Sequence, residues 1–540
     1  MLCSVIATAQ QASLAVLHAH VWTGNPAQPW AGALAIDGDS ILAVGDAAAI
    51  QKLIGPHTRV LDAHGGMVAP GFIDSHVHFL AGGLNLTSVQ LREARSKAEF
   101  IARIKAYAAH TPPGTWIAGG DWDHQNWGGE LPSKDWIDAV TPRNPVWINR
   151  LDGHMSLANS LALAAAHIDR NTSDAPGGEI VRDASGNPTG IFKDNATSLI
   201  DRVMPPPSAE MLDRALDAAM QYVAARGVTS VGHMGTWDDL DVFRRARQAG
   251  RLRTRIRAAV PLPTWQRLAE TVARDGRGDD YLQIGCLKAF VDGSLGSHTA
   301  ALLDPYTDSP KDTGLLVNQP DDLYRWTSDA TRAGLQVMVH AIGDRAIRLQ
   351  LDIFDRVRVG VGHAQPDPRF RIEHAQHVAQ ADLPRFAAIG VIPSMQPYHA
   401  IDDGRWAEKE IGPERAKTSY AWRSLLDLHA RLAFGSDWPV APPAPLDGIY
   451  AAVTRRTLDG KHPGGWVPQQ RITVEEALRA YTSDAAYAEF AEKRKGTLEP
   501  GKLADFVVLD RDLTRIPAPE IRNARVMTTV VGGQVVFEGH

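Results

Sequence analysis

Short runs of apolar and β-branched residues alternate with helical patterns through the middle of the chain. There are eight such runs, and this alternation is typical of strands and helices around a parallel sheet. The runs lie at 67–78, 227–233, 254–260, 284–291, 335–341, 371–376, 390–396 and 431–438. Eight strands of this kind predict an α/β fold, the (β/α)₈ TIM barrel, which carries its chemistry at the carboxyl ends of the strands.

The two ends of the chain have a different pattern, with short strands and few helices. Residues 33–44 predict a hairpin that turns at Asp37-Gly38-Asp39. Two more apolar runs lie near the other end, at 505–510 and 526–537, and the second is broken by Gly532-Gly533. We therefore expect one composite β-sandwich from both termini, formed by 14–66 and 491–540, beside a barrel over 67–490.

One connection is much longer than the others. About 150 residues separate the first predicted strand from the second, whereas a βα connection usually has roughly 2–6. The excess predicts an inserted subdomain after barrel strand 1, at about 85–215. Its densest aromatic patch is 121–127. Trp122 in this patch could form part of a wall against an apolar substrate group, although tryptophans more often pack an insertion against its host.

The composition narrows the classes of protein. The chain has 540 residues, of which 44% are hydrophobic and 22% charged, with a net charge of -6. This argues against a nucleic-acid-binding protein and a disordered chain, and no apolar run is long enough to span a membrane. Only Cys3 and Cys286 are present, which excludes a disulfide framework and a cysteine-rich zinc module. The expected partner is a small-molecule substrate, and assembly into a homo-oligomer is left open.

The first residues resemble a secretory leader in one respect. A short apolar stretch is followed by Ala7-Thr8-Ala9, which has the pattern of a cleavage site. The stretch is short and no lysine or arginine precedes it, so the cytoplasm is the expected compartment. The alternative is export to the periplasm, with residues 1–9 as a leader. Residues 1–13 belong to neither domain and are expected to be a leader or disordered.

Candidate metal ligands stand where the predicted strands end. Side chains two positions apart on a strand project from the same face, so His76 and His78 can present both imidazoles to one ion. A lone His-X-His pair is more often a surface or hydrogen-bonded pair. Here Lys288, His340, His374 and Asp437 also follow apolar runs. Unrelated core histidines would not be expected to lie consistently at the ends of predicted strands. We therefore expect the side chains of this set to converge at the barrel mouth.

The stretches that carry these residues resemble the amidohydrolase superfamily, and within it the amidohydrolase-3 branch of YtcJ-like proteins and N-substituted formamide deformylases. The resemblance covers nearly the whole chain. It rests on 69–78, 288–296, 340–344, 371–376, 435–440 and 496–505. Motifs of this length, in this order, specify the superfamily and the branch but not the substrate.

The resemblance implies a metal-dependent hydrolase with a particular ligand set. His76 and His78 would bind one divalent ion together with Asp437, while His340 and His374 would bind a second. Nitrogen and oxygen donors without thiolate suit Zn²⁺, and Mn²⁺, Fe²⁺ or Co²⁺ can occupy such a site as well. One or two ions are compatible with the sequence.

Lys288 would bridge the two ions as a carbamate, because carboxylation converts a poor ligand into an anionic oxygen donor. Two alternatives stay open: a mononuclear site in which Lys288 is unmodified, and a structural ion pair, for example with Asp292.

The expected reaction is hydrolysis of a carbon–nitrogen bond other than a peptide bond, such as an N-acyl or N-formyl amide. An ion in this site lowers the pKa of bound water towards neutrality and polarises the scissile carbonyl. Asp437 is expected to accept the proton and pass it to the leaving nitrogen. The alternatives are a lactone or ester hydrolase on the same site and a non-catalytic binding protein of the same fold.

Three other histidines are weaker candidates. His154 lies in a stretch that recurs in this branch and could bind the substrate carbonyl, with a structural role as the alternative. His233 and His298 are left out of the ligand set, which is already complete. At His233 the chain also departs from the branch, whose members commonly carry a His-Asp pair where this chain has Gly232-His233.

Overall fold

The computed structural model describes residues 11–151, 153, 155–176, 178–362 and 367–539. The leader-like residues 1–9 and the candidate His154 therefore lie outside the described residues. The chain forms two compact units, one of Leu80–Ala219 and the other of Met1–Phe79 with Met220–His540. Over the described ranges, no helix is both long and apolar enough to cross a bilayer.

Eight parallel strands of the larger unit form one sheet, in the order β20-β19-β18-β17-β16-β15-β14-β8. The strands are β8 (Phe72–Val77), β14 (Val228–Met234), β15 (Arg255–Pro261), β16 (Leu282–Phe290), β17 (Gln336–Ala341), β18 (Arg371–His374), β19 (Ile392–Met395) and β20 (Ala433–Phe434). A parallel bridge between Val77 and Trp438 joins the last strand region to the first. The sheet is thus nearly closed, and the predicted (β/α)₈ barrel is confirmed.

Helices follow most of these strands and cover the barrel. They are α8 (Trp237–Gln248), α9 (Trp265–Asp275), α10 (Pro320–Arg332), α11 (Asp344–Val361), α12 (Leu383–Ile389), α13 (Pro397–Asp403), α14 (Ala407–Ala416), α15 (Trp422–Asp427), α16 (Pro445–Thr454), α17 (Val474–Ala480) and α18 (Ser483–Ala488). The sequence of α8 shows why a helix forms there. Thr236 and Asp239 form a capping box at its start, and Leu240 and Phe243 bury one face.

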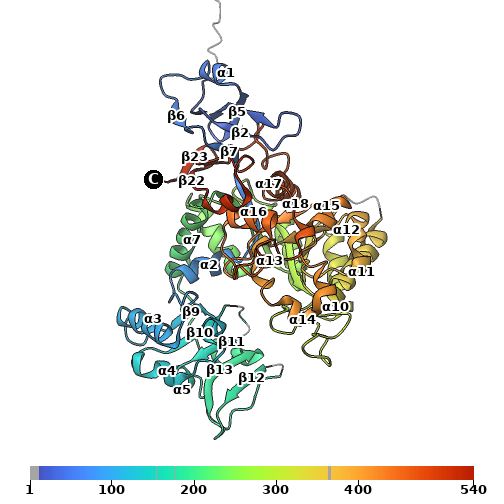
Figure 1. Ribbon diagram of the computed structural model, residues 1–540. Helices are drawn as coiled ribbons and strands as arrows, with labels where there is room; N and C mark the ends of the chain where they lie inside the picture. The colour runs from blue at the N-terminus through green and yellow to red at the C-terminus, as the bar shows by residue number, and fades with distance from the viewer. Residues whose placement is uncertain (1–10, 152, 154, 177, 363–366, 540) are drawn as a thin grey trace, which may run out of the picture. The chain divides into compact units, whose positions relative to one another are not determined.

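Two further sheets form the composite β-sandwich, with the orders β5-β4-β1-β6 and β23-β22-β21-β7-β2-β3. Their strands are β1 (Leu14–Leu17), β2 (His20–Trp22), β3 (Trp30–Ala31), β4 (Ala33–Asp37), β5 (Ser40–Gly45), β6 (Arg59–Asp62), β7 (Met67–Pro70), β21 (Phe506–Leu509), β22 (Val526–Val531) and β23 (Gln534–Glu538), with α1 (Ala47–Gln51) at the edge. In the second sheet Val68 of β7 pairs with Val21 on one side and Val508 on the other. Strands from both ends of the chain, blue and red in Figure 1, therefore share one sheet.

The first predicted barrel strand, 67–78, is two strands in two sheets. β7 pairs with β2 and β21 in the sandwich, whereas β8 pairs with β14 in the barrel. The chain changes sheet at Gly71, where an added Cβ would lie 2.3 Å from the Thr229 side chain. An unbroken apolar run does not reveal such a change, because both strands are buried.

The smaller unit is built on a five-stranded sheet in the order β12-β13-β11-β10-β9. Its strands are β9 (Ile117–Trp122), β10 (Val146–Arg150), β11 (Met155–Ala158), β12 (Gly178–Arg182) and β13 (Pro188–Asp194), with helices α3 (Lys97–Ala109), α4 (Lys134–Ile137), α5 (Ser160–Ala165) and α6 (Ser198–Asp201) (Figure 1). Its core packs Phe100 and Ile104 of α3 against Trp122 and Ile148 of the sheet. The helices α2 (Phe79–Leu86) and α7 (Ala209–Ala224) begin and end its sequence range.

Candidate metal centre

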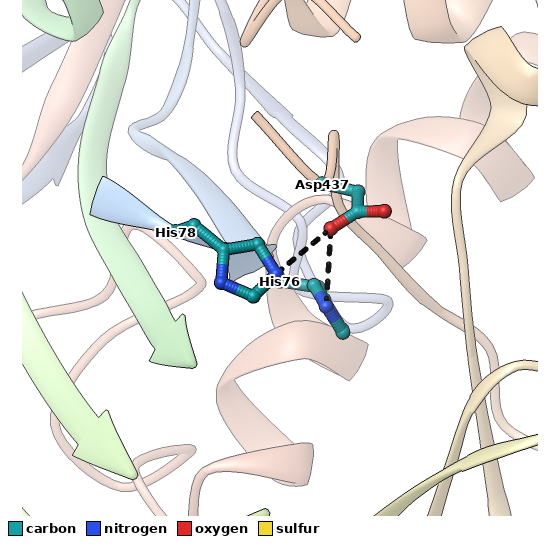
Figure 2. Close-up of side chains that lie close together, drawn as sticks. All are labelled: His76, His78 and Asp437. Atoms are coloured by element: carbon teal, nitrogen blue, oxygen red, sulfur yellow. Dashed lines mark ion pairs between the residues drawn. The ribbon is translucent and has the colours of Figure 1, made fainter. Parts of the chain in front are cut away.

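His76, His78 and Asp437 meet where β8 and β20 end (Figure 2). The Nε2 atoms of both histidines lie 3.3 Å from the same carboxylate oxygen, Asp437 Oδ1. Bonds of about 2.0–2.2 Å to one ion, at a tetrahedral angle, place two donor atoms roughly 3.3–3.5 Å apart. The three side chains are therefore spaced as ligands of one ion would be.

The turn after β20 holds Asp437 in place. Asp74 accepts hydrogen bonds from both the backbone N–H and the hydroxyl of Ser436, at 2.8 and 2.6 Å. An added Cβ at Gly435 would lie 2.6 Å from the backbone nitrogen of His76, so glycine permits the close approach of the two strand ends. Asp437 itself has a φ of 63°, a left-handed conformation that aspartate adopts more readily than most non-glycine residues.

His340 and His374 come to the same place from β17 and β18. The ring centroids of His76 and His374 are 4.7 Å apart, and those of His340 and His374 are 4.5 Å apart. Each ring donates one N–H within the protein. His374 Nδ1 donates a hydrogen bond to the side-chain oxygen of Gln396 at 2.9 Å, and His340 Nε2 donates one to the backbone oxygen of Gly293 at 3.0 Å. The other nitrogen of each ring remains to accept a proton or an ion.

Lys288 completes the predicted set on β16. Its Nζ lies 3.4 Å from His76 Nε2, and the residue is 5% exposed. Burial lowers the pKa of the Lys288 ammonium to about 8. Lys288 and Asp292 are both described in the structure, and no ion pair joins them. The Asp292 carboxylate instead accepts hydrogen bonds from backbone N–H groups, including those of Ile342 and Gly343. The structure thus brings all six predicted ligands together.

The charges of the site suit a cation. Burial lowers the pKa of His340 to about 3, and it lowers the pKa of His374 well below its usual value, so both rings are neutral donors. Burial would raise the pKa of Asp437, but the neighbouring His76 holds it well below its usual range. Asp437 Oδ1 is buried and has no hydrogen-bond partner among the described residues. A buried carboxylate oxygen of this kind is costly unless it binds a cation, so the donor set fits a divalent ion.

Two residues of this region were missed in the sequence. His399, on α13, forms a second group with His374 and Asp437, in which one donor atom from each lies within 4.8 Å of the others. The only feature of the sequence that marks His399 is its position three residues after the predicted strand 390–396. Glu373 directly precedes His374, and no pattern in the sequence marks it; its carboxylate lies 2.6 Å from His76 Nδ1.

Other candidates lie in different surroundings. His233 Nδ1 accepts the backbone N–H of Phe79 at 3.0 Å. His298 lies between carboxylates, with Asp308 and Asp312 each 3.6 Å away. Trp122 is fully buried in the core of the smaller unit, where its indole N–H donates to the backbone oxygen of Ile148.

Comparisons with known proteins agree with this geometry. A sequence model described as the amidohydrolase family matches residues 59–537. The chain is 41% identical over 539 residues to Protein LONG AFTER FAR-RED 3 of Arabidopsis thaliana, covering 97% of this chain and 92% of that protein. It is 29% identical over 545 residues to N-substituted formamide deformylase of Arthrobacter pascens, covering 98% and 99%.

A solved structure extends the comparison to the fold. An uncharacterized metal-dependent hydrolase from Pyrococcus horikoshii OT3 superposes with a TM-score of 0.78 at 29% identity, covering 94% of this chain and 99% of that one. The resemblance inferred from the sequence motifs is confirmed by these matches.

Proposed function

Because the chain belongs to the amidohydrolase family and is a metal-dependent hydrolase, we propose that it hydrolyses a carbon–nitrogen bond other than a peptide bond in a small N-acyl or N-formyl amide. The observation that carries the proposal is the convergence of His76, His78 and Asp437 on one point at the barrel mouth. Similarity over nearly the full length to a formamide deformylase supports the choice of bond.

The proposed cofactor is Zn²⁺, as one or two ions. His76, His78 and Asp437 would hold the first, and His340 and His374 the second. When bound, such an ion polarises a carbonyl oxygen and lowers the pKa of water. The chain would supply the proton transfer: Asp437, ionised and buried, accepts a proton from the attacking water and returns it to the leaving nitrogen.

Lys288 is proposed to bridge the two ions as a carbamate. Support comes from its burial and from the 3.4 Å between its Nζ and His76 Nε2, which place it inside the ligand cluster. Substrate contact by His154 stays a prediction, since that residue lies outside the described ones. Substrate contact by Trp122 also stays a prediction, and its burial in the smaller unit gives it no support.

Lys288→Ala is expected to lose most of the bound metal, because the variant lacks the only predicted bridging ligand. Elemental analysis of the purified protein measures the ion content. Lys417→Ala, which removes a lysine that is exposed and paired with Glu414, is the matched control and should keep its metal. Two ions at full occupancy in Lys288→Ala would refute the carbamate. Retention of one ion would favour a mononuclear site with unmodified Lys288.

The proposed reaction is tested with paired substrates that share one acyl group, an amide and the corresponding ester or lactone. Turnover of N-formyl or N-acyl amides, lost in Asp437→Asn, is the expected result. Turnover of esters alone would replace the proposal with an ester or lactone hydrolase. A protein that binds metal but turns over neither series would indicate a binding protein of the same fold.

A further inference from the structure

A fully buried chain of charged groups lies behind His76. Its Nδ1 is 2.6 Å from Glu373 Oε2. Glu373 Oε1 in turn accepts a hydrogen bond from Arg371 Nε at 2.7 Å, and Glu373 Oε2 accepts a second from Arg371 Nη2 at 3.1 Å. The side chains of His76, Glu373 and Arg371 are all 0% exposed. No water competes for these contacts, so the arrangement of the three groups is fixed by the protein alone.

The guanidinium is itself anchored. Arg371 Nη2 also donates to the backbone oxygen of Ser75 at 2.8 Å and to the Ser394 hydroxyl at 2.9 Å. Arg371 therefore ties β18 to β8, which carries His76, and to β19. A carboxylate whose two oxygens both accept hydrogen bonds from one planar guanidinium has one orientation, and that orientation presents Oε2 to the imidazole.

The carboxylate determines which nitrogen of His76 faces the cluster. An ionised carboxylate only accepts hydrogen bonds, so Nδ1 must donate, and Nε2 is the nitrogen left to bind an ion. Both oxygens of Glu373 accept hydrogen bonds from the guanidinium of Arg371, which is always charged, so the carboxylate is held in its ionised form. The Nε2 atom of His76 faces away from Glu373 and lies 3.3 Å from Asp437 Oδ1 and 3.4 Å from Lys288 Nζ.

We propose that Glu373, oriented by Arg371, is a positioning residue that fixes the ring and the tautomer of His76 and thereby sets the affinity of the centre for its ion. The inference rests on the proposed function, because it assumes that His76 is a ligand. When the second nitrogen of a histidine ligand donates a hydrogen bond to a carboxylate, the first nitrogen binds a metal ion more strongly and the ring is held in one direction. Loss of such a carboxylate lowers metal affinity about 10–100-fold.

The competing explanation is that Arg371 and Glu373 are only a structural ion pair of the barrel. A structural pair would change the melting temperature of the metal-free protein and leave the Zn²⁺ dissociation constant of the folded protein unchanged. Metal affinity therefore separates the two explanations, and activity does not.

The test measures Zn²⁺ binding by competition with a chromophoric chelator in the unaltered protein, Glu373→Gln and Glu373→Asp. Glutamine removes the charge. Aspartate keeps a carboxylate beside Arg371 but withdraws it from His76, and it carries the test if the glutamine variant does not fold. The matched control is Glu492→Gln, because Glu492 accepts two hydrogen bonds from Arg369 and contacts no histidine among its described partners.

Both Glu373 variants are expected to bind Zn²⁺ about 10–100-fold more weakly, while Glu492→Gln binds as the unaltered protein does. In the Co²⁺-loaded proteins the visible absorption band should shift for both Glu373 variants and not for Glu492→Gln, since the band reports how strongly His76 binds the ion. Unchanged Zn²⁺ affinity in folded Glu373→Gln or Glu373→Asp would overturn the inference and leave the proposed function standing. An unaltered protein that binds no divalent ion would overturn the proposed function itself.

Discussion

Asp437→Asn is expected to lower kcat by about 10²–10⁴-fold, the usual contribution of a general acid–base group. The asparagine side chain has nearly the same shape, but it cannot accept the proton from water and is a weaker ligand. Steady-state kinetics on the amide substrate measures the effect, and elemental analysis shows how much of it is loss of metal. A variant that keeps its metal and turns over at nearly the original rate would show that Asp437 is not the base.

The control for this substitution is Asp241→Asn on the surface of α8. Asp241 is exposed and pairs with Arg244 at 3.3 Å, one helical turn away. Exposed pairs of this kind contribute about 0–1 kcal/mol to stability, so the control variant should be as stable and as active as the unaltered protein.

Removing the metal is the second change with a large expected effect. Dialysis against a chelator should abolish amide hydrolysis, and added Zn²⁺ should restore it. The melting temperature should fall as well, because an ion that binds only the folded state stabilises it by about 2.7 kcal/mol at a free concentration a hundred times its Kd. Elemental analysis, an activity assay and a thermal melt are made on the same sample.

Substitution of a ligand should have the same consequence as the chelator. His78→Ala is expected to be poor in metal and inactive, whereas His110→Ala, at an exposed helix end in the smaller unit, should behave normally. Hydrolysis by a protein shown to be free of metal would contradict both the cofactor and the reaction.

The barrel and the clustering of the six candidate ligands at its mouth could be predicted because each depends on a local pattern. His76 and His78 are two positions apart on one strand, and the run before each of the other candidates is apolar enough to mark a strand end. Strand number and order then place those ends at one mouth. The division of 67–78 into β7 and β8 could not be predicted, since it depends on the packing of Gly71 against Thr229 rather than on the hydrophobic pattern.

The residues that surround the candidate ligands could not be predicted for a similar reason. Glu373 and His374 are consecutive, and on a regular strand they would face opposite sides. In the structure both reach His76, because His374 has a φ of 75° and the strand ends there. His399 lies on a helix after β19, where no strand end marks it. Backbone conformation at single residues decides these contacts, and composition and periodicity carry little information about it.

The six-stranded sheet constrains the order in which this protein can be assembled on the ribosome. β7 takes β2 as one neighbour early in synthesis, but its other neighbour, β21, begins only at Phe506. At roughly 5–20 residues per second, β7 waits some tens of seconds with one edge unpaired. An unpaired edge of buried residues such as Val68 invites pairing with other chains, so the nascent protein passes through a period in which this edge is open to such pairing.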